Sequence, residues 1–141
     1  MDITQSTLVL LKPDAVQRKL CGEILSRFER KGLMLTALKL LKLTPAMAAE
    51  HYHEHTGKPF YPGLVEFITS GPVVAMVLTG PNAVKIVRTM MGSTNPVDAP
   101  SGTIRGDFAT VMSQNIVHGS DSPASAQREI AIYFSEQELV Q

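Results

Sequence analysis

The sequence predicts an α+β fold in which a four-stranded antiparallel sheet carries helices packed on it. Three features indicate this class: short apolar runs of strand length, apolar stripes at helical spacing between them, and proline or glycine at most boundaries. The predicted elements follow the order strand-helix-strand twice, βαββαβ. Two such units side by side are typical of the split βαβ, or ferredoxin-like, arrangement, and we expect its helices on one face of the sheet.

The first unit begins with a buried strand. Thr7–Leu11 is apolar on both of its alternating faces, as expected for a strand covered on both sides, and a Lys-Pro pair ends it and leaves Lys12 at its exit. An apolar stripe at helical spacing, closed by a glycine, predicts a helix over Cys21–Lys31. The branched, apolar segment Leu33–Leu43 predicts the second strand, and Thr44 before a proline caps a further helix.

The second unit repeats this pattern. Pro72–Leu78 is another apolar run of strand length, and Pro81–Met91 carries a helical stripe that ends before a glycine. Met91–Ser125 is rich in small and turn-forming residues, which predicts a long functional loop inside the domain, and Asn115–His118 predicts a short strand after this loop. A serine-proline pair then predicts the start of a last helix, which runs through Phe134.

Length and composition fit one domain over residues 1–141, since 44% of the residues are hydrophobic and 18% are charged. The 13 Lys and Arg residues balance the 13 Asp and Glu residues, so no global field could hold nucleic acid or an anionic membrane as a main partner. No apolar stretch approaches the ~18 residues of a membrane span, and the start of the chain lacks a signal-peptide pattern. The single cysteine, Cys21, cannot form an internal disulfide, so we expect a cytoplasmic location.

Any phosphate group must be held by side chains, because the sequence contains neither GxxxxGK[ST] nor GxGxxG. Four cations stand out by their placement: Lys12 at a strand exit, Lys58 before a proline, Arg88 beside a helical stripe, and Arg105 in a glycine-flanked turn. Arg88 either points into a pocket or extends its head to water. The glycines around Arg105 allow a close approach to an anion.

The densest group of reactive side chains is Asn115–Ser122, and three interpretations of its histidine stay open. His118 is a structural residue at a strand end, part of a Ser-His-Asp hydrolase, or itself a nucleophile. The hydrolase fits poorly, because His118, Ser120 and Asp121 are too close in sequence for the usual relay and no GxSxG is present. A nucleophilic ring needs a partner that fixes its tautomer, and Glu129, beside an apolar helical stripe, is a candidate.

A second histidine group lies in Glu50–His55. His51 and His55, four residues apart, would share a helical face, as zinc ligands sometimes do. The HExxH spacing is missing, however, and no cysteine accompanies them, so a solvated helix surface explains the pattern equally well.

Taken in order along the chain, several motifs resemble the nucleoside diphosphate kinase family over nearly the whole length. They are Leu11-Lys12-Pro13-Asp14-Ala15-Val16, Gly22-Glu23-Ile24, Lys58-Pro59-Phe60, Leu64-Val65, Ser70-Gly71-Pro72-Val73, Thr94-Asn95-Pro96, Gly102-Thr103-Ile104-Arg105-Gly106-Asp107-Phe108, and Asn115 with His118-Gly119-Ser120-Asp121-Ser122.

This resemblance implies a ping-pong transfer in which a nucleoside triphosphate gives its γ-phosphate to Nδ1 of His118 and a nucleoside diphosphate such as GDP then collects it. It implies that Ser120 and Glu129 support the histidine and that Phe60 stacks on the base, with broad base tolerance. The phosphates and sugar would be held by Lys12, Arg88, Thr94, Arg105 and Asn115. Mg²⁺ would arrive on the nucleotide phosphates without a protein cage, and the chain would form a homo-oligomer, a hexamer in preference to a tetramer.

Two alternatives from other classes stay open beside this enzyme. One is a regulatory or scaffold protein that keeps the fold and acts through partners or nucleic acid. The other is a small metal-binding module built on His51 and His55.

Overall fold

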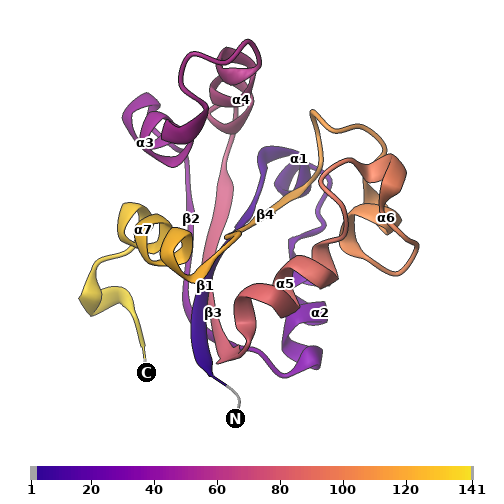
Figure 1. Ribbon diagram of the computed structural model, residues 1–141, viewed down its shortest axis with the longest axis vertical. Helices are drawn as coiled ribbons and strands as arrows, with labels where there is room; N and C mark the ends of the chain where they lie inside the picture. The colour runs from indigo at the N-terminus through magenta and orange to yellow at the C-terminus, as the bar shows by residue number, and fades with distance from the viewer. Residues whose placement is uncertain (1–2, 141) are drawn as a thin grey trace.

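The computed structural model describes residues 3–140, and its centre is a four-stranded sheet with helices on either side (Figure 1). The strands are β1 (Thr4–Leu11), β2 (Met34–Leu41), β3 (Val73–Pro81) and β4 (Val117–Gly119). The helices are α1 (Pro13–Gln17), α2 (Cys21–Lys31), α3 (Pro45–His51), α4 (Tyr61–Ile68), α5 (Ala83–Met91), α6 (Ile104–Phe108) and α7 (Pro123–Tyr133). Short 3-10 turns span His53–His55, Pro96–Asp98 and Glu136–Glu138.

The strand order is β2-β3-β1-β4, and every neighbouring pair is antiparallel, which agrees with the predicted βαββαβ sheet. β1 lies in the middle and pairs with β3 along its whole length, with Leu8 opposite Val77. On its other side β1 pairs with the short strand β4, where Leu10 lies opposite His118. Because residues directly opposite each other point to the same face, His118 shares the face of Leu10.

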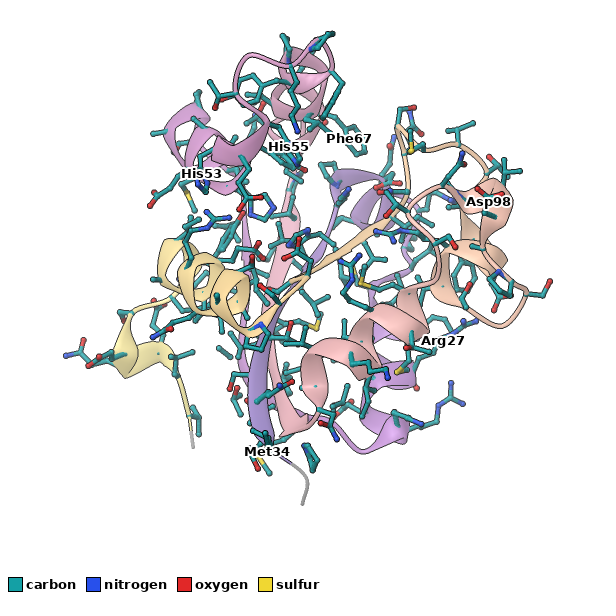
Figure 2. The ribbon with its side chains drawn as sticks, viewed as in Figure 1. Arg27, Met34, His53, His55, Phe67 and Asp98 are labelled. Carbon is teal, nitrogen blue, oxygen red and sulfur yellow. The ribbon has the colours of Figure 1, made fainter. Side chains whose placement is uncertain are left out.

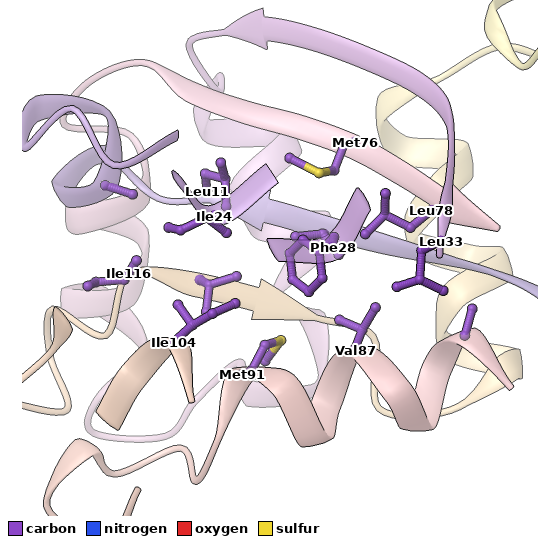
Figure 3. Close-up of a cluster of buried hydrophobic side chains, with 14 of the residues drawn as sticks. Leu11, Ile24, Phe28, Leu33, Met76, Leu78, Val87, Met91, Ile104 and Ile116 are labelled. Carbon is purple, nitrogen blue, oxygen red and sulfur yellow. The ribbon is translucent and has the colours of Figure 1, made fainter. Parts of the chain in front are cut away.

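Helices cover both faces of the sheet, so the expectation that they lie on one face is wrong. On one face Val9 and Leu11 pack with Phe28 of α2 and Val87 of α5 (Figure 3). On the other face Leu8 and Leu10 pack in a second buried cluster with residues of α3, α4 and α7. The physical reason is the pattern of β1, in which Leu8–Leu11 are all fully buried and each face needs its own cover.

The helix boundaries follow local chemistry that the sequence displays. Gly32 ends α2 in a left-handed conformation at φ 104°, which glycine adopts without steric cost. Thr44 caps α3 by accepting the backbone N–H of Met47 at 3.1 Å, and Ser122 caps α7 in the same way. α7 ends at Tyr133, one residue before the predicted end.

Some elements differ from the sequence-based expectation. α1, α4 and α6 were not predicted, and α6 interrupts the predicted long loop. The last strand is Val117–Gly119 and not Asn115–His118, because Ile116 has a φ of 75° that a strand cannot continue through. Within residues 3–140 no helix has the length and apolar character needed to cross a membrane.

Candidate active site

A cavity of about 870 Å³ opens beside β4, and its walls come from helices of both layers and from the loop before β4. Two residues that line it are labelled in the upper part of Figure 2: His55, in the 3-10 turn after α3, and Phe67 of α4. Every predicted site residue lines this cavity except Ser120, which is fully buried behind it. Lys58, the remaining cation chosen from the sequence, is exposed and does not line the cavity.

His118 is held by a carboxylate through one ring nitrogen. Its Nε2 lies 2.7 Å from Oε1 of Glu129, which α7 carries into the cavity wall. An ionised carboxylate only accepts hydrogen bonds, so Nε2 carries the proton and Nδ1 keeps its lone pair. The side chain of His118 is 22% exposed, against 7% for Glu129, so the ring remains accessible from the cavity while its partner is enclosed.

Buried hydrogen bonds fix Glu129 in turn. The hydroxyl of Ser120 donates to the same Oε1 at 2.8 Å, and Ser120 itself accepts the backbone N–H of Leu8 at 3.2 Å. The other oxygen, Oε2, lies 3.7 Å from the guanidinium of Arg128, which also donates to the backbone carbonyl of Glu50 at the end of α3. A buried carboxylate needs such partners, and these anchor it to both β1 and α3.

Besides Arg128, which pairs with Glu129, three further cations line the same cavity: Lys12, Arg88 and Arg105. In the described part of the chain none of them forms an ion pair with a carboxylate. Burial, followed by repulsion from Arg105 and partly opposed by attraction to Asp14, lowers the pKa of Lys12 to about 8. Burial and the nearby charge of Arg88 lower the pKa of Arg105 to about 10. Cations held together in this way favour binding of a multiply charged anion.

Arg105 also holds the backbone around the site. Its Nε donates to the carbonyl of Asn115, and its two terminal nitrogens donate to the carbonyls of Val117 and Gly92 at 2.7 and 3.0 Å. A guanidinium has five N–H donors, so two of them remain for a ligand. Arg105 therefore combines a structural contact with the capacity to bind an anion.

Polar groups continue from Lys12 along the cavity wall. Its Nζ donates to Oδ1 of Asn115 at 2.8 Å, and Nδ2 of Asn115 donates to the carbonyl of Thr94 at 3.0 Å. Asn115 is thereby oriented by both neighbours, and Thr94 is fixed at the cavity edge. The three residues, far apart in sequence, form one polar strip.

The mouth of the cavity is apolar and accessible. Phe60 is 52% exposed and Met112 is 58% exposed, although both are large hydrophobic residues. Leu64 and Phe67 of α4 line the wall nearby. Exposed apolar side chains at a cavity rim are typical of a ligand-binding surface, and an aromatic ring can stack on any base.

His51 is not on a solvated surface, as one alternative interpretation held, but is only 5% exposed. Its Nδ1 lies 3.1 Å from the hydroxyl of Tyr133, and its ring packs edge-on against His118 with centroids 4.5 Å apart. Burial, with the nearby His118 as the next cause, lowers the pKa of His51 to about 2, so this ring stays neutral. Burial raises the pKa of its neighbour Tyr52 to about 12.

The proposed metal pair does not form the helical arrangement that its spacing predicts. α3 ends at His51, and His55 lies in the following 3-10 turn. Across residues 3–140 no group of three or more His, Cys, Asp or Glu side chains is placed to hold a metal ion.

Three residues around the site were not predicted from the sequence, Asp14, Tyr52 and Arg128, and His51 was predicted only as a metal ligand or a solvated residue. The Asp in Lys12-Pro13-Asp14 was visible only as part of a motif, and the burial of Asp14 depends on contacts about a hundred residues away. Arg128 precedes Glu129 on the same helix, and this adjacency was the available signal for it.

Comparison with known proteins gives consistent matches. The family model described as "Nucleoside diphosphate kinase" matches residues 5–139. A nucleoside diphosphate kinase of Thermus thermophilus is 59% identical over 136 residues, covering 96% of this chain and 99% of that protein. One of Archaeoglobus fulgidus is 56% identical over 136 residues, covering 96% of this chain and 90% of that protein.

Solved structures agree with these sequence matches. A nucleoside diphosphate kinase family protein from Babesia bovis has a TM-score of 0.95 at 50% identity, covering 97% of this chain and 93% of its own. A halophilic nucleoside diphosphate kinase from Halobacterium salinarum, in complex with CDP, has a TM-score of 0.96 at 48% identity, covering 100% and 93%. The predicted fold class is confirmed by both.

Proposed function

Because this chain belongs to the nucleoside diphosphate kinase family and is a phosphotransferase of that kind, we propose that it transfers phosphate by a ping-pong mechanism through a phosphohistidine at His118. One observation carries the proposal. The ring of His118, held at Nε2 by Glu129, lies in the same cavity as three cations that form no ion pair with a carboxylate within residues 3–140.

In the first half-reaction the Nδ1 lone pair of His118 attacks the γ-phosphorus of a nucleoside triphosphate, and the bond to the bridging oxygen breaks. The diphosphate leaves with that electron pair. The ring becomes cationic, and the negative carboxylate of Glu129 stabilises it through the Nε2 proton. In the second half-reaction a terminal oxygen of another nucleoside diphosphate attacks the phosphorus, the Nδ1–P bond breaks, and its electron pair returns to the ring, which is again neutral.

Lys12, Arg88 and Arg105 bind the phosphates in this proposal. A contact between unit charges at 4 Å is worth about 4 kcal/mol at an effective dielectric constant of ~20, before desolvation is subtracted. Several such contacts offset the cost of drying a triphosphate and follow the negative charge as it moves during transfer. Thr94 and Asn115 complete the polar strip against the phosphates and sugar.

Mg²⁺ is proposed as the cofactor, carried by the nucleotide. The donor set fits this role, because the cavity is lined by several cations and only dispersed carboxylates, among them the exposed Asp121, and residues 3–140 place no group of three or more His, Cys, Asp or Glu side chains to hold the ion. When bound, Mg²⁺ neutralises charge on the phosphate oxygens.

Phe60 is proposed to stack on the nucleotide base. Its half-exposed ring at the mouth of the cavity presents a face on which any base can stack, so the proposal includes broad base tolerance. The CDP bound to the Halobacterium relative is compatible with a site of this kind.

The chain is proposed to act as a homo-oligomer. Strand β2 lies at the edge of the sheet, and it exposes Met34, Leu38 and Leu40 at 62%, 50% and 66%; Met34 is labelled at the lower end of Figure 2. An exposed apolar edge strand is a surface on which a second copy can pair. The family resemblance favours a hexamer over a tetramer, and light scattering measures the mass of the assembly. A cytoplasmic location is proposed separately, from the single cysteine.

The direct test is to mix the protein with γ-³²P-labelled ATP and Mg²⁺, remove the nucleotide, and measure acid-labile label on the protein. We expect the label to pass to added GDP. His118→Ala should take up no label, whereas His53→Ala, at an exposed histidine outside the cavity, should label normally. An unlabelled wild-type protein, or a labelled His118→Ala variant, would reject the mechanism.

A further inference from the structure

We propose that Asp14 is a positioning residue for phosphoryl transfer, which holds Ile116 in a left-handed turn and supplies the negative charge that keeps the neighbouring Lys12 cationic. The inference rests on the proposed function for the role of Lys12, but the two effects on Ile116 and Lys12 can be measured without it. Asp14 is separate from the residues that contact the nucleotide in that proposal.

Asp14 lies in the first turn of α1 and is only 5% exposed. Its Oδ2 accepts the backbone N–H of Ile116, at the far end of the chain, at 3.1 Å. Its Oδ1 is buried and has no hydrogen-bond partner within the described residues. A buried carboxylate with one unsatisfied oxygen is costly, so its presence here needs a compensating role.

That role begins with the backbone of Ile116. Its φ of 75° lies in the left-handed region, which a β-branched residue rarely adopts and does not keep unless its surroundings fix it. The carbonyl of Ile116 accepts the backbone N–H of Lys12 at 2.8 Å, while Asp14 accepts its N–H. Both polar groups of this residue are therefore held by the segment that joins β1 to α1.

The turn at Ile116 sets the direction of its neighbours. Asn115, before it, points its side chain to Lys12 and Thr94, and His118 follows two residues later on β4. Arg105 fixes the carbonyls on both sides of Ile116, those of Asn115 and Val117. The N–H of Val117 also donates to the carbonyl of Asn115 across the turn, at 2.7 Å, and Asp14 holds the N–H of Ile116 between them, so its loss loosens the turn at its centre.

The second effect is electrostatic. Lys12 faces Arg105 from α6, the neutral His51 from α3, and Asp14 from α1. Burial and Arg105 lower the pKa of Lys12 to about 8, and Asp14 is the group that opposes them. Because Lys12 must be protonated to attract phosphate, its useful charge is present below this pKa and is lost as the pH rises through it.

The test separates the hydrogen bond from the charge with two variants. Asp14→Asn keeps a side-chain oxygen that can accept the N–H of Ile116 but removes the charge, whereas Asp14→Ala removes both. The matched control is Asp107→Asn, which removes a carboxylate that likewise accepts a backbone N–H, that of Gly102, at the first turn of α6.

The first measurement is the NMR titration of the Lys12 amino group in the protein without nucleotide. We expect its pKa to fall below about 8 in Asp14→Asn and to stay unchanged in Asp107→Asn. An unchanged Lys12 titration in Asp14→Asn would overturn the electrostatic part. Because this measurement involves no catalysis, it tests the effect of Asp14 on the pKa of Lys12 even if the phosphohistidine mechanism is wrong.

The second measurement is kcat/KM for phosphorylation by ATP across pH, because this ratio reports groups of the free enzyme. The quantity to compare is the ratio of kcat/KM at pH 8 to kcat/KM at pH 6.5. We expect this ratio to be about threefold lower in Asp14→Asn than in the wild type. In Asp14→Ala we expect the same pH effect and in addition a lower kcat at pH 6.5, since the turn is freed. Parallel pH profiles, with a uniform loss that follows only the folded fraction, would show a merely structural role and overturn the proposal.

Discussion

Strand β1 contributes side chains to both faces of the sheet, but the residues that cover the two faces differ in polarity. The α2–α5 face receives Val9 and Leu11 and is packed by hydrophobic side chains such as Phe28 and Met76 (Figure 3). The α3–α7 face receives Leu8 and Leu10, yet it also holds buried polar residues near His118: His51, Ser120, Glu129 and Tyr133.

This difference shows where the buried polar contacts of His118 are held, although α5 and α6 on the apolar side also bring Arg88 and Arg105 to the cavity. Apolar burial stabilises the α2–α5 face without any requirement for precise hydrogen bonding. On the α3–α7 face each buried polar group needs a partner, and the hydrogen bonds of Glu129 and Tyr133 supply it. The comparison predicts that substitutions inside the apolar cluster of the α2–α5 face lower the free energy of unfolding. Substitutions on the side of the α3–α7 face and the cavity should instead change the pH dependence of stability or the binding of substrate.

The largest expected effect on stability belongs to Phe28→Ala. Phe28 is fully buried in the α2–α5 face, so its removal should lower the free energy of unfolding by about 3–5 kcal/mol. The rate of phosphohistidine formation by the folded protein should stay within about twofold of wild type, since the residue is not part of the cavity wall. Urea unfolding measures the free energy of unfolding, and single-turnover labelling measures the rate. A large loss of rate in fully folded protein would contradict the prediction that the α2–α5 cluster affects stability alone.

A smaller effect, confined to acid, is expected for His51→Gln on the α3–α7 face. The pKa of His51 is about 2 in the folded protein against 6.5 for an exposed histidine, so below pH 6.5 the unfolded chain binds a proton that the folded chain does not. The stability associated with neutral His51 is present above pH 6.5 and is lost as the pH falls from there toward 2.

Relative to His51→Gln, the wild type should therefore lose roughly 2 kcal/mol of stability between pH 6.5 and pH 4.5. Denaturant unfolding at several pH values measures this, with His53→Gln, at an exposed histidine, as the control. Equal pH slopes for wild type and His51→Gln would mean that His51 titrates normally.

The smallest effect on stability is expected at the rim of the cavity, for Phe60→Ala. Loss of a stacking ring should weaken nucleotide binding by about 1–3 kcal/mol, to a similar extent for purine and pyrimidine diphosphates. Stability should hardly change, because the ring is already half exposed. Calorimetric binding of ADP, GDP and CDP tests this, and a loss limited to one base would contradict sequence-independent stacking.

Much of the fold follows from sequence patterns because they express local physics. The stripe and glycine cap of α2, and the hydroxyl caps of α3 and α7, place these helices to within a residue or two. The placement of helices on both faces depended on long-range packing, although the fully apolar β1 already indicated that both faces are buried. The helix α6, only five residues long, carries too few periodic positions for recognition.

The candidate site was predictable in part for the same reason. The motifs identified residues that the structure brings together around His118, as in the polar strip of Lys12, Asn115 and Thr94. The sequence could not show that His51 is buried, because its partner Tyr133 lies 82 residues further along the chain. Nor could it show the left-handed turn of Ile116, since a β-branched residue predicts extended backbone, whereas hydrogen bonds from Lys12 and to Asp14, both distant in sequence, hold the turn.

The proposal that Glu129 directs the chemistry to one ring nitrogen is tested most directly by NMR of the phosphorylated protein. With ¹⁵N-labelled histidine, the coupling to phosphorus identifies which nitrogen of His118 carries the phosphoryl group. Because Glu129 occupies Nε2, we predict phosphorus on Nδ1 alone. A phosphoryl group on Nε2 would contradict it, since that nitrogen would have to leave its carboxylate partner to react.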